Sequence, residues 1–173
     1  CLLSRGLGDV YKRQMLVGIF EPNAKPAFKD TGIVPENFSF GELPDDFDHF
    51  EPYLKKSFHR LPMLENAGIR KFFSGPESFT PDTQYLLGET PEIKNFFTCC
   101  GFNSIGIASS GGAGRVTAEW MINGHINEDL FSVDIKRFQQ FHSSKKFIME
   151  RVTETLGDLY GMHWPYKQHK TSR

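Results

Sequence analysis

The stretch GFNSIGIASSGGAGRVTAEWM, residues 101–121, decides the fold because it joins a strand to a helix through a glycine-rich loop. The residues before it, NFFTCCG at 95–101, form an apolar run that favours a strand. A helical pattern extends from about 108 to 123, and Gly124 stands where a helix commonly stops. We therefore predict a strand–loop–helix unit in which the helix begins inside the glycine run.

The start of this predicted helix is suited to bind a negative or polarised group. A helix start leaves N–H groups unpaired and carries about half a positive charge, and glycine lets a ligand approach the backbone. Phosphate motifs do not fit, because Arg115 stands where a P-loop has Lys, and Thr117 replaces the third glycine of a dinucleotide fingerprint. An alternative stays open at this point: the glycines at 111, 112 and 114 only allow the helix to pack closely on a sheet.

The remaining pattern indicates an α+β (α/β) fold with few strands. Helices are predicted at 47–61 and 146–159, and short apolar runs predict strands at 15–20 and 69–74. The residues Pro-Asp-Thr at 81–83 predict the turn of a hairpin. The apolar stripe of the first helix consists of Phe47, Phe50, Leu54, Phe58 and Leu61. We expect the sheet to continue outside this chain, because so few strands do not make a self-sufficient sheet.

The composition argues against several classes of function. The chain has 173 residues with 17 Phe, and its 20 basic and 21 acidic residues give a net charge of −1. This balance argues against a nucleic-acid or membrane surface, and no apolar run approaches the ~20 residues that span a bilayer. The six histidines and the cysteines at 1, 99 and 100 lack metal-ligand spacing, so we expect no metal site.

The first residues need separate treatment. Residues 1–14, CLLSRGLGDVYKRQ, begin with Cys rather than Met and resemble translated sequencing-adaptor sequence. We expect this segment to be non-native and the native stretch to begin mid-domain near Met15.

Several blocks carry a resemblance to a known family. They are FGELPDDFDHFEPYLKKSFHRLP at 40–62, GPESFTPDTQYLLGE at 75–89, GFNSIGIASSGGAG at 101–114, DIKRF at 134–138 and ERVTETLGDLYGMHWPYKQHKTSR at 150–173. These blocks resemble the dimethylglycine and sarcosine dehydrogenases and the related pyruvate dehydrogenase phosphatase regulatory subunit. The resemblance identifies 15–124 as the C-terminal part of an FAD-dependent oxidoreductase domain and 125–173 as the start of the family's central domain.

This resemblance implies a fold, a cofactor and site residues. The fold is an FAD-dependent amine oxidase fold, in which a Rossmann-type FAD domain interleaves with a substrate domain built on an antiparallel sheet. The helix that follows the glycine-rich loop is expected to aim its start at the flavin N1 and C2 carbonyl. Glu77 and Asp82 are expected on the substrate side, although Asp82 is first of all a turn residue. The residues expected along the pyrimidine end of the flavin are Phe102, Asn103, Ser104, Ile105, Gly106 and Ile107.

The implied function is oxidation of a methylated amine, such as dimethylglycine or sarcosine, by hydride transfer to FAD. The main catalytic residues are expected upstream of Met15 and a tetrahydrofolate-binding domain after Arg173, so we expect the chain alone to be inactive. The electron acceptor is left open, and the expected compartment is the bacterial cytoplasm or the mitochondrial matrix. Two other hypotheses remain: a regulatory relative that keeps the fold without the chemistry, and a non-flavin interaction module.

Overall fold

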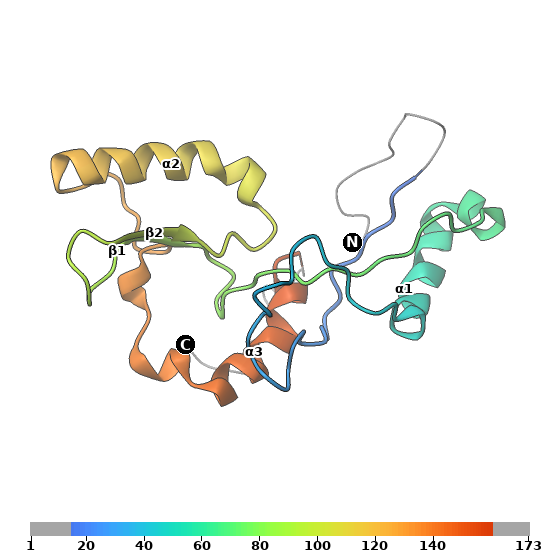
Figure 1. The fold of residues 1–173 in the computed structure, drawn as a ribbon. Coiled ribbons are helices and arrows are strands. Elements are labelled where there is room, and N and C mark those ends of the chain that lie inside the picture. The colour runs from blue at the N-terminus through green and yellow to red at the C-terminus, as the bar shows by residue number, and fades with distance from the viewer. Residues whose placement is uncertain (1–14, 161–173) are drawn as a thin grey trace, which may run out of the picture. The chain divides into compact units, whose positions relative to one another are not determined.

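In a computed structural model, residues 15–160 are described and form two compact units. The first unit contains residues 15–21 and 33–76, and the second contains 22–32 and 77–160 (Figure 1). The adaptor-like stretch 1–14 and the polar tail from 161 onward lie outside the described residues. Within them, three α-helices and several short 3₁₀ turns accompany one small antiparallel sheet, so the class is α+β.

A hairpin covered by a long helix forms the main part of the second unit. Strand β1 (Leu86–Glu89) pairs antiparallel with β2 (Phe97–Cys100), and Leu87 lies opposite Cys99. Helix α2 (Gly106–Asn123) runs along one face of this hairpin (Figure 1). The helix ends at Gly124, whose left-handed φ of 73° lets its N–H donate to the Trp120 carbonyl.

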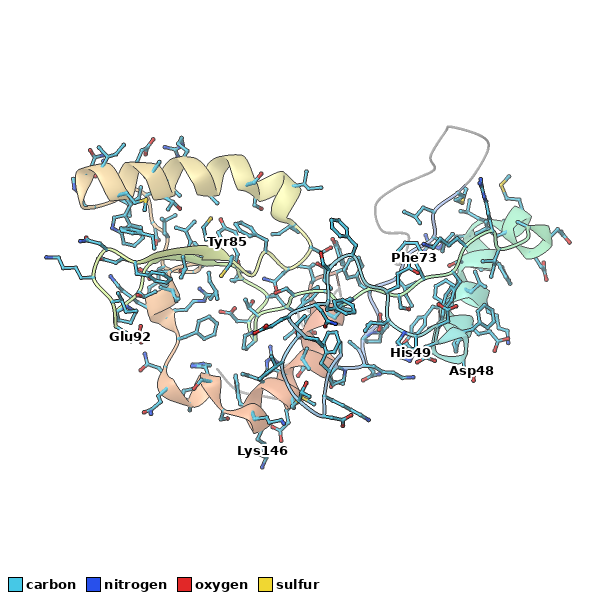
Figure 2. The ribbon with its side chains drawn as sticks, viewed as in Figure 1. Asp48, His49, Phe73, Tyr85, Glu92 and Lys146 are labelled. Atoms are coloured by element: carbon cyan, nitrogen blue, oxygen red, sulfur yellow. The ribbon has the colours of Figure 1, made fainter. Side chains whose placement is uncertain are left out.

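The core of the second unit lies between the hairpin and α2. It consists of Leu87, Ala113, Val116 and Val133, and Leu87 is fully buried. Tyr85, labelled in Figure 2, packs against this cluster together with Phe102 and Trp120. The backbone continues the same contact, because the N–H of Leu87 donates to the carbonyl of Val133 at 2.9 Å.

Helix α3 (Lys145–Asp158) completes the second unit and buries polar groups. Ser144 caps its start by accepting from the N–H of Phe147 at 3.3 Å. The buried positions of α3 include Arg151, which donates to Glu154 at 3.0 Å. Two 3₁₀ turns, η3 (Ile135–Arg137) and η4 (Gln140–Ser143), connect α2 to α3.

The first unit is built on α1 (Phe47–Arg60), followed by the 3₁₀ turn η2 (Pro62–Asn66). Asp46 caps α1 by accepting from the N–H of His49, and the rings of Phe47, Phe50 and Phe72 meet at centroid distances of 5.3–6.4 Å. The imidazole of His49, labelled in Figure 2, lies 3.2 Å from the Glu21 carboxylate and is half-buried. Pro52 lies in the second turn of α1, where its missing N–H costs the helix one internal hydrogen bond.

Two predicted strands and one predicted hairpin are wrong. Residues 15–20 form no strand, and in 69–74 only Ser74 makes a bridge, to Leu43. The turn at 81–83 exists but joins no hairpin, because Thr80 bonds to Asn103 instead of to a facing strand, and β1 turns to β2 through 90–96. Helix α2 begins at Gly106, two residues before the predicted start at about 108, and the glycines at 111, 112 and 114 lie inside it.

Those three glycines do not mediate tight packing in the described structure. A Cβ added at any of them would meet nothing within 4 Å, whereas the positions that face the hairpin carry Ala113, Val116 and Trp120. The packing alternative therefore does not explain the glycine run within residues 15–160.

Candidate functional site

The loop that enters α2 has a strained backbone. Asn103 has φ 48° and Ser104 has φ 65°, so two consecutive non-glycine residues occupy the left-handed region. Asparagine adopts this conformation more readily than serine, and each such residue costs free energy that the surroundings must supply. Strain of this kind is often kept where a loop must present its backbone in a fixed shape.

The side chain of Asn103 holds this loop in place. Asn103 is 1% exposed, and its amide group donates to the carbonyl of Gly101 at 2.7 Å. Its side-chain oxygen accepts from the N–H of Thr80 at 2.8 Å, and the Thr80 hydroxyl lies 3.1 Å from its amide nitrogen. That hydroxyl donates to the carbonyl of Gln84 at 2.7 Å. A segment 23 residues earlier in the chain thus fixes the strained loop.

The start of α2 has no side-chain cap. Ile105 is the N-cap residue, and an isoleucine side chain has no atom that accepts a hydrogen bond. The first-turn N–H groups and the positive end of the helix dipole are therefore available to a negative or polarised group. Gly106 fits closely at this start, because a Cβ there would lie 3.3 Å from the Cβ of Phe102 and would require a shift of a few tenths of an ångström.

A hollow of about 310 Å³ lies at this helix start. Five of the six residues expected along the flavin line it, and Ile105 caps the helix beside it. Glu77 also lines the hollow, so the structure brings one substrate-side candidate to the same place. The ring of Phe102 stacks on that of Tyr85 at a centroid distance of 4.8 Å, which anchors one wall to the core. The lining residues are Glu77, Ser78, Phe102, Asn103, Ser104, Gly106 and Ile107.

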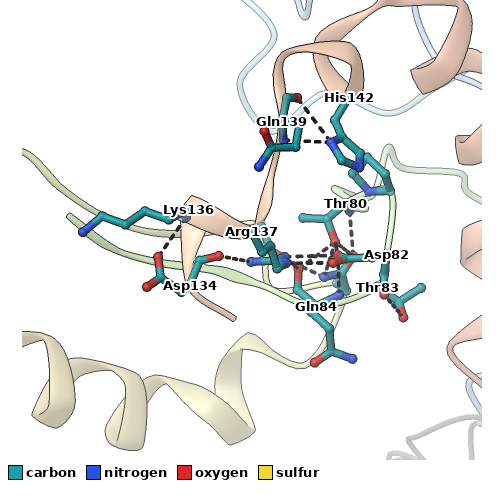
Figure 3. Close-up of polar contacts among 12 residues, drawn as sticks. Thr80, Asp82, Thr83, Gln84, Asp134, Lys136, Arg137, Gln139 and His142 are labelled. Atoms are coloured by element: carbon teal, nitrogen blue, oxygen red, sulfur yellow. Dashed lines mark hydrogen bonds and ion pairs between the residues drawn. The ribbon is translucent and has the colours of Figure 1, made fainter. Parts of the chain in front are cut away.

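Asp82, the second substrate-side candidate, does not line this hollow. Its carboxylate accepts two hydrogen bonds from Arg137, at 2.7 and 3.1 Å, and the side chains are only 14% and 9% exposed (Figure 3). Sequence reasoning missed Arg137, because a partner 55 residues away produces no local spacing or motif. In the described structure, the carboxylate of Asp82 is bound to a protein cation.

No metal or membrane feature accompanies the hollow. Among residues 15–160, no group of three or more His, Cys, Asp or Glu side chains could hold a metal ion. None of the helices in that range has both the length and the apolarity that crossing a bilayer requires.

Comparison with known proteins shows which family contains the residues that line the hollow. Residues 12–120 match the family described as FAD dependent oxidoreductase, and this match contains every residue that lines the hollow. The chain belongs to the FAD dependent oxidoreductase family. Residues 123–173 match the FAD dependent oxidoreductase central domain, so the two matches follow each other along the chain.

Three curated relatives illustrate what this family member is similar to. It is 40% identical over 92% of its length to 4-methylaminobutanoate oxidase (formaldehyde-forming) of Paenarthrobacter nicotinovorans. It is 36% identical over 96% of its length to the mitochondrial pyruvate dehydrogenase phosphatase regulatory subunit of Mus musculus, and 37% identical over 91% to the mitochondrial sarcosine dehydrogenase of the same organism. The chain covers 17–19% of the length of these relatives, so it corresponds to about a fifth of each.

Proposed function

We propose that the protein to which this chain belongs is an FAD-dependent oxidoreductase that oxidises an N-methyl amine. The supporting observation is that three features of the candidate site lie within the same family match. The uncapped start of α2, the strained loop before it and the hollow of about 310 Å³ all fall within the match to the FAD dependent oxidoreductase family. The proposed fold is the FAD-dependent amine oxidase fold, of which 15–124 would form the C-terminal part of the oxidase domain and 125–173 the start of the central domain.

The residues of the hollow fit the electron-rich edge of a flavin ring. Phe102 and Ile107 offer apolar surface, and the first-turn N–H groups of α2 offer donors that the side chain of the N-cap residue Ile105 does not cap. We propose that residues 102–107 hold this edge, with the backbone at Ser104 and Gly106 in closest approach. N–H donors fixed before the reaction stabilise negative charge where it develops, at no cost of reorganisation. Bound FAD supplies the acceptor of the hydride.

Glu77 is the better of the two substrate-side candidates. It lines the hollow, whereas the Asp82 carboxylate is bound to Arg137. We propose that Glu77 faces the amine of the substrate, where its negative charge favours a positively charged group. The main catalytic residues are proposed to come from sequence upstream of Met15.

The proposed substrate is a small methylated amino acid. The names of two relatives specify 4-methylaminobutanoate and sarcosine, and each of these compounds carries an N-methyl amine and a carboxylate. Removal of a hydride from the N-methyl carbon leaves an iminium, and water converts the iminium to formaldehyde and the demethylated amine. Transfer of the one-carbon unit to tetrahydrofolate, in a further domain, is a proposed variant of the second step.

The test uses the full-length protein from the gene that contains this chain. We expect it to purify with visible flavin absorption, to reduce a dye when given 4-methylaminobutanoate, sarcosine or dimethylglycine, and to release one formaldehyde per oxidised amine. Adding tetrahydrofolate and measuring the loss of free formaldehyde tests the folate variant. Absence of flavin from the purified protein, after incubation with FAD, would refute the proposal.

A second candidate function is supported by the relation to the pyruvate dehydrogenase phosphatase regulatory subunit. In that case the protein would bind FAD and oxidise no amine. The same assays distinguish the two candidates, because full flavin occupancy without dye reduction or formaldehyde release by any methylated amine favours the regulatory candidate.

A further inference from the structure

Arg137 makes a set of hydrogen bonds that depends on the planar shape of its guanidinium group (Figure 3). Its Nε and Nη2 donate to the two carboxylate oxygens of Asp82, at 2.7 and 3.1 Å. Nη2 also donates to the carbonyl of Gln84 at 2.8 Å, and Nη1 donates to the carbonyl of Asp134 at 3.0 Å. A lysine keeps the charge but does not reproduce this fork. Because the pair is largely withdrawn from water, loss of one partner leaves an uncompensated charge.

The turn that Arg137 holds is the turn that fixes the candidate flavin loop. One carboxylate oxygen of Asp82 accepts from the N–H of Gln84 at 3.2 Å, and the carbonyl of Gln84 accepts from the hydroxyl of Thr80 at 2.7 Å. Thr80 in turn donates its N–H to Asn103 at 2.8 Å. A series of hydrogen bonds therefore runs from Arg137 and Asp82 through Gln84 and Thr80 to Asn103.

A second arginine holds the neighbouring peptide of the same turn. Arg151 of α3 donates from Nε to the carbonyl of Pro81 at 2.8 Å, and Glu154 accepts from its Nη1. Arg137 and Arg151 both lie in the segment that matches the central domain, whereas the turn and the hollow lie in the match to the oxidoreductase family. The central-domain segment thus holds the turn at two adjacent points.

We propose that Asp82 and Arg137 are positioning residues of the flavin site, which act through Thr80 and Asn103 on loop 102–107. This inference rests on the proposed function. The left-handed conformations of Asn103 and Ser104 cost free energy, and the buried bonds of Asn103 oppose their relaxation. When the ion pair is removed, the turn loosens, Asn103 loses its fixed partner and the uncapped start of α2 shifts relative to the hollow.

The first arm of the test measures backbone opening without any flavin. Hydrogen exchange is followed by mass spectrometry in the full-length apoprotein for the wild type, Asp82→Asn, Arg137→Met and the double variant. We expect peptides that cover 101–108 to exchange about tenfold faster in both single variants, with little further change in the double variant, because the two residues act as a unit. Arg137→Lys should fall between wild type and Arg137→Met.

The matched control is Glu128→Gln, which removes one charge of the ion pair between Arg115 of α2 and the segment after the helix. The Arg115–Glu128 pair has a distance of 2.8 Å, but its side chains are 55% and 40% exposed and do not contact the turn. We expect exchange at 101–108 in this variant to match the wild type. Faster exchange confined to peptides covering 80–84, with 101–108 unchanged in Asp82→Asn and Arg137→Met, would overturn the inference.

The second arm measures flavin binding. We expect Asp82→Asn and Arg137→Met to raise the Kd for FAD about tenfold and to alter the shape of the visible flavin spectrum, while Glu128→Gln changes neither. Faster exchange at 101–108 with unchanged Kd and spectrum would show a packing role alone and overturn the positioning role. A wild-type protein that binds no FAD refutes the proposed function, and with it the flavin role of the pair. The hydrogen-exchange measurement then still tests whether Asp82 and Arg137 hold loop 102–107 in place.

Discussion

Arg115 and Arg137 make ion pairs of similar length but differ in their exposure to water. Arg115 donates to Glu119 and Glu128 at 2.8 Å from the outer face of α2, and these side chains are 40–55% exposed. Pairs of this kind contribute little to stability, because water screens the attraction and long side chains lose freedom. The largely buried pair of Arg137 has the greater influence on the surrounding chain.

The exposed Arg115–Glu128 pair nevertheless has a measurable effect on the pKa of Glu128. The hydrogen bond from Arg115 holds the pKa of Glu128 below its ordinary value. A carboxyl whose folded pKa is lowered stabilises the folded state above the unfolded pKa, and this contribution is lost as the pH falls through the folded pKa. We expect Arg115→Gln to raise the Glu128 pKa back toward its ordinary value, measured by NMR titration of labelled glutamate carboxyls.

The melting temperature at neutral pH should change little in Arg115→Gln, because the pair lies in solvent. An unchanged Glu128 pKa in the variant would show that Arg115 does not cause the shift.

At the scale of single elements, two glycines are expected to respond to alanine in opposite directions. Gly88 in β1 has φ 110°, and a Cβ there would lie 2.7 Å from the ring of Trp120. Gly112 lies inside α2, where a Cβ would meet nothing within 4 Å. We expect Gly88→Ala to destabilise the protein by roughly 2 kcal/mol or more and Gly112→Ala to stabilise it by about 1 kcal/mol. Urea unfolding of both variants measures the two signs.

The pair also tests where α2 begins. A helix that started at Gly111 would place Gly112 in its first turn, where alanine gains less. Destabilisation by Gly112→Ala would show that a part of the full-length protein covers this face of α2.

The elements also show what the sequence could and could not predict. The stripe of α1, the strand at 97–100 and the stop at Gly124 were predictable, because each depends on local spacing or on one glycine conformation. The start of α2 is predicted at about 108, two residues after the observed start, because glycine is a poor helix former and weakens the helical pattern there. The hairpin was misplaced for a related reason: a good turn sequence at 81–83 does not reveal that Thr80 bonds to Asn103.

For the molecule as a whole, the candidate site was only partly predictable. The segment 102–107 and Glu77 were chosen from the resemblance, and six of these seven residues line one hollow. The contacts of Arg137 and Arg151 with the turn at 81–84 were not predictable, because each joins residues more than 50 positions apart. An ion pair between residues far apart in the chain leaves no local motif in the sequence, whereas a glycine-rich loop is itself a local motif.

The core of the second unit contains residues from both family matches. Leu87, Ala113 and Val116 belong to the match at 12–120, and Val133 belongs to the match at 123–173. A single cavity in this cluster should therefore loosen both segments. We expect Leu87→Ala to lower the free energy of unfolding by about 2–5 kcal/mol, because Leu87 is fully buried and its removal leaves unfilled space.

The measurement combines urea unfolding with hydrogen exchange of peptides from 106–120 and 131–138 in the full-length protein. The matched control is Ile122→Ala on the outer face of α2, where the side chain is 82% exposed and the change should stay within about 0.5 kcal/mol. If Leu87→Ala accelerated exchange in 106–120 but left 131–138 at the wild-type rate, the two segments would not share one core. In that case the contact between Leu87 and Val133 would contribute little to the stability of the second unit. The central-domain segment would then hold the turn at 81–84 only through the hydrogen bonds of Arg137 and Arg151.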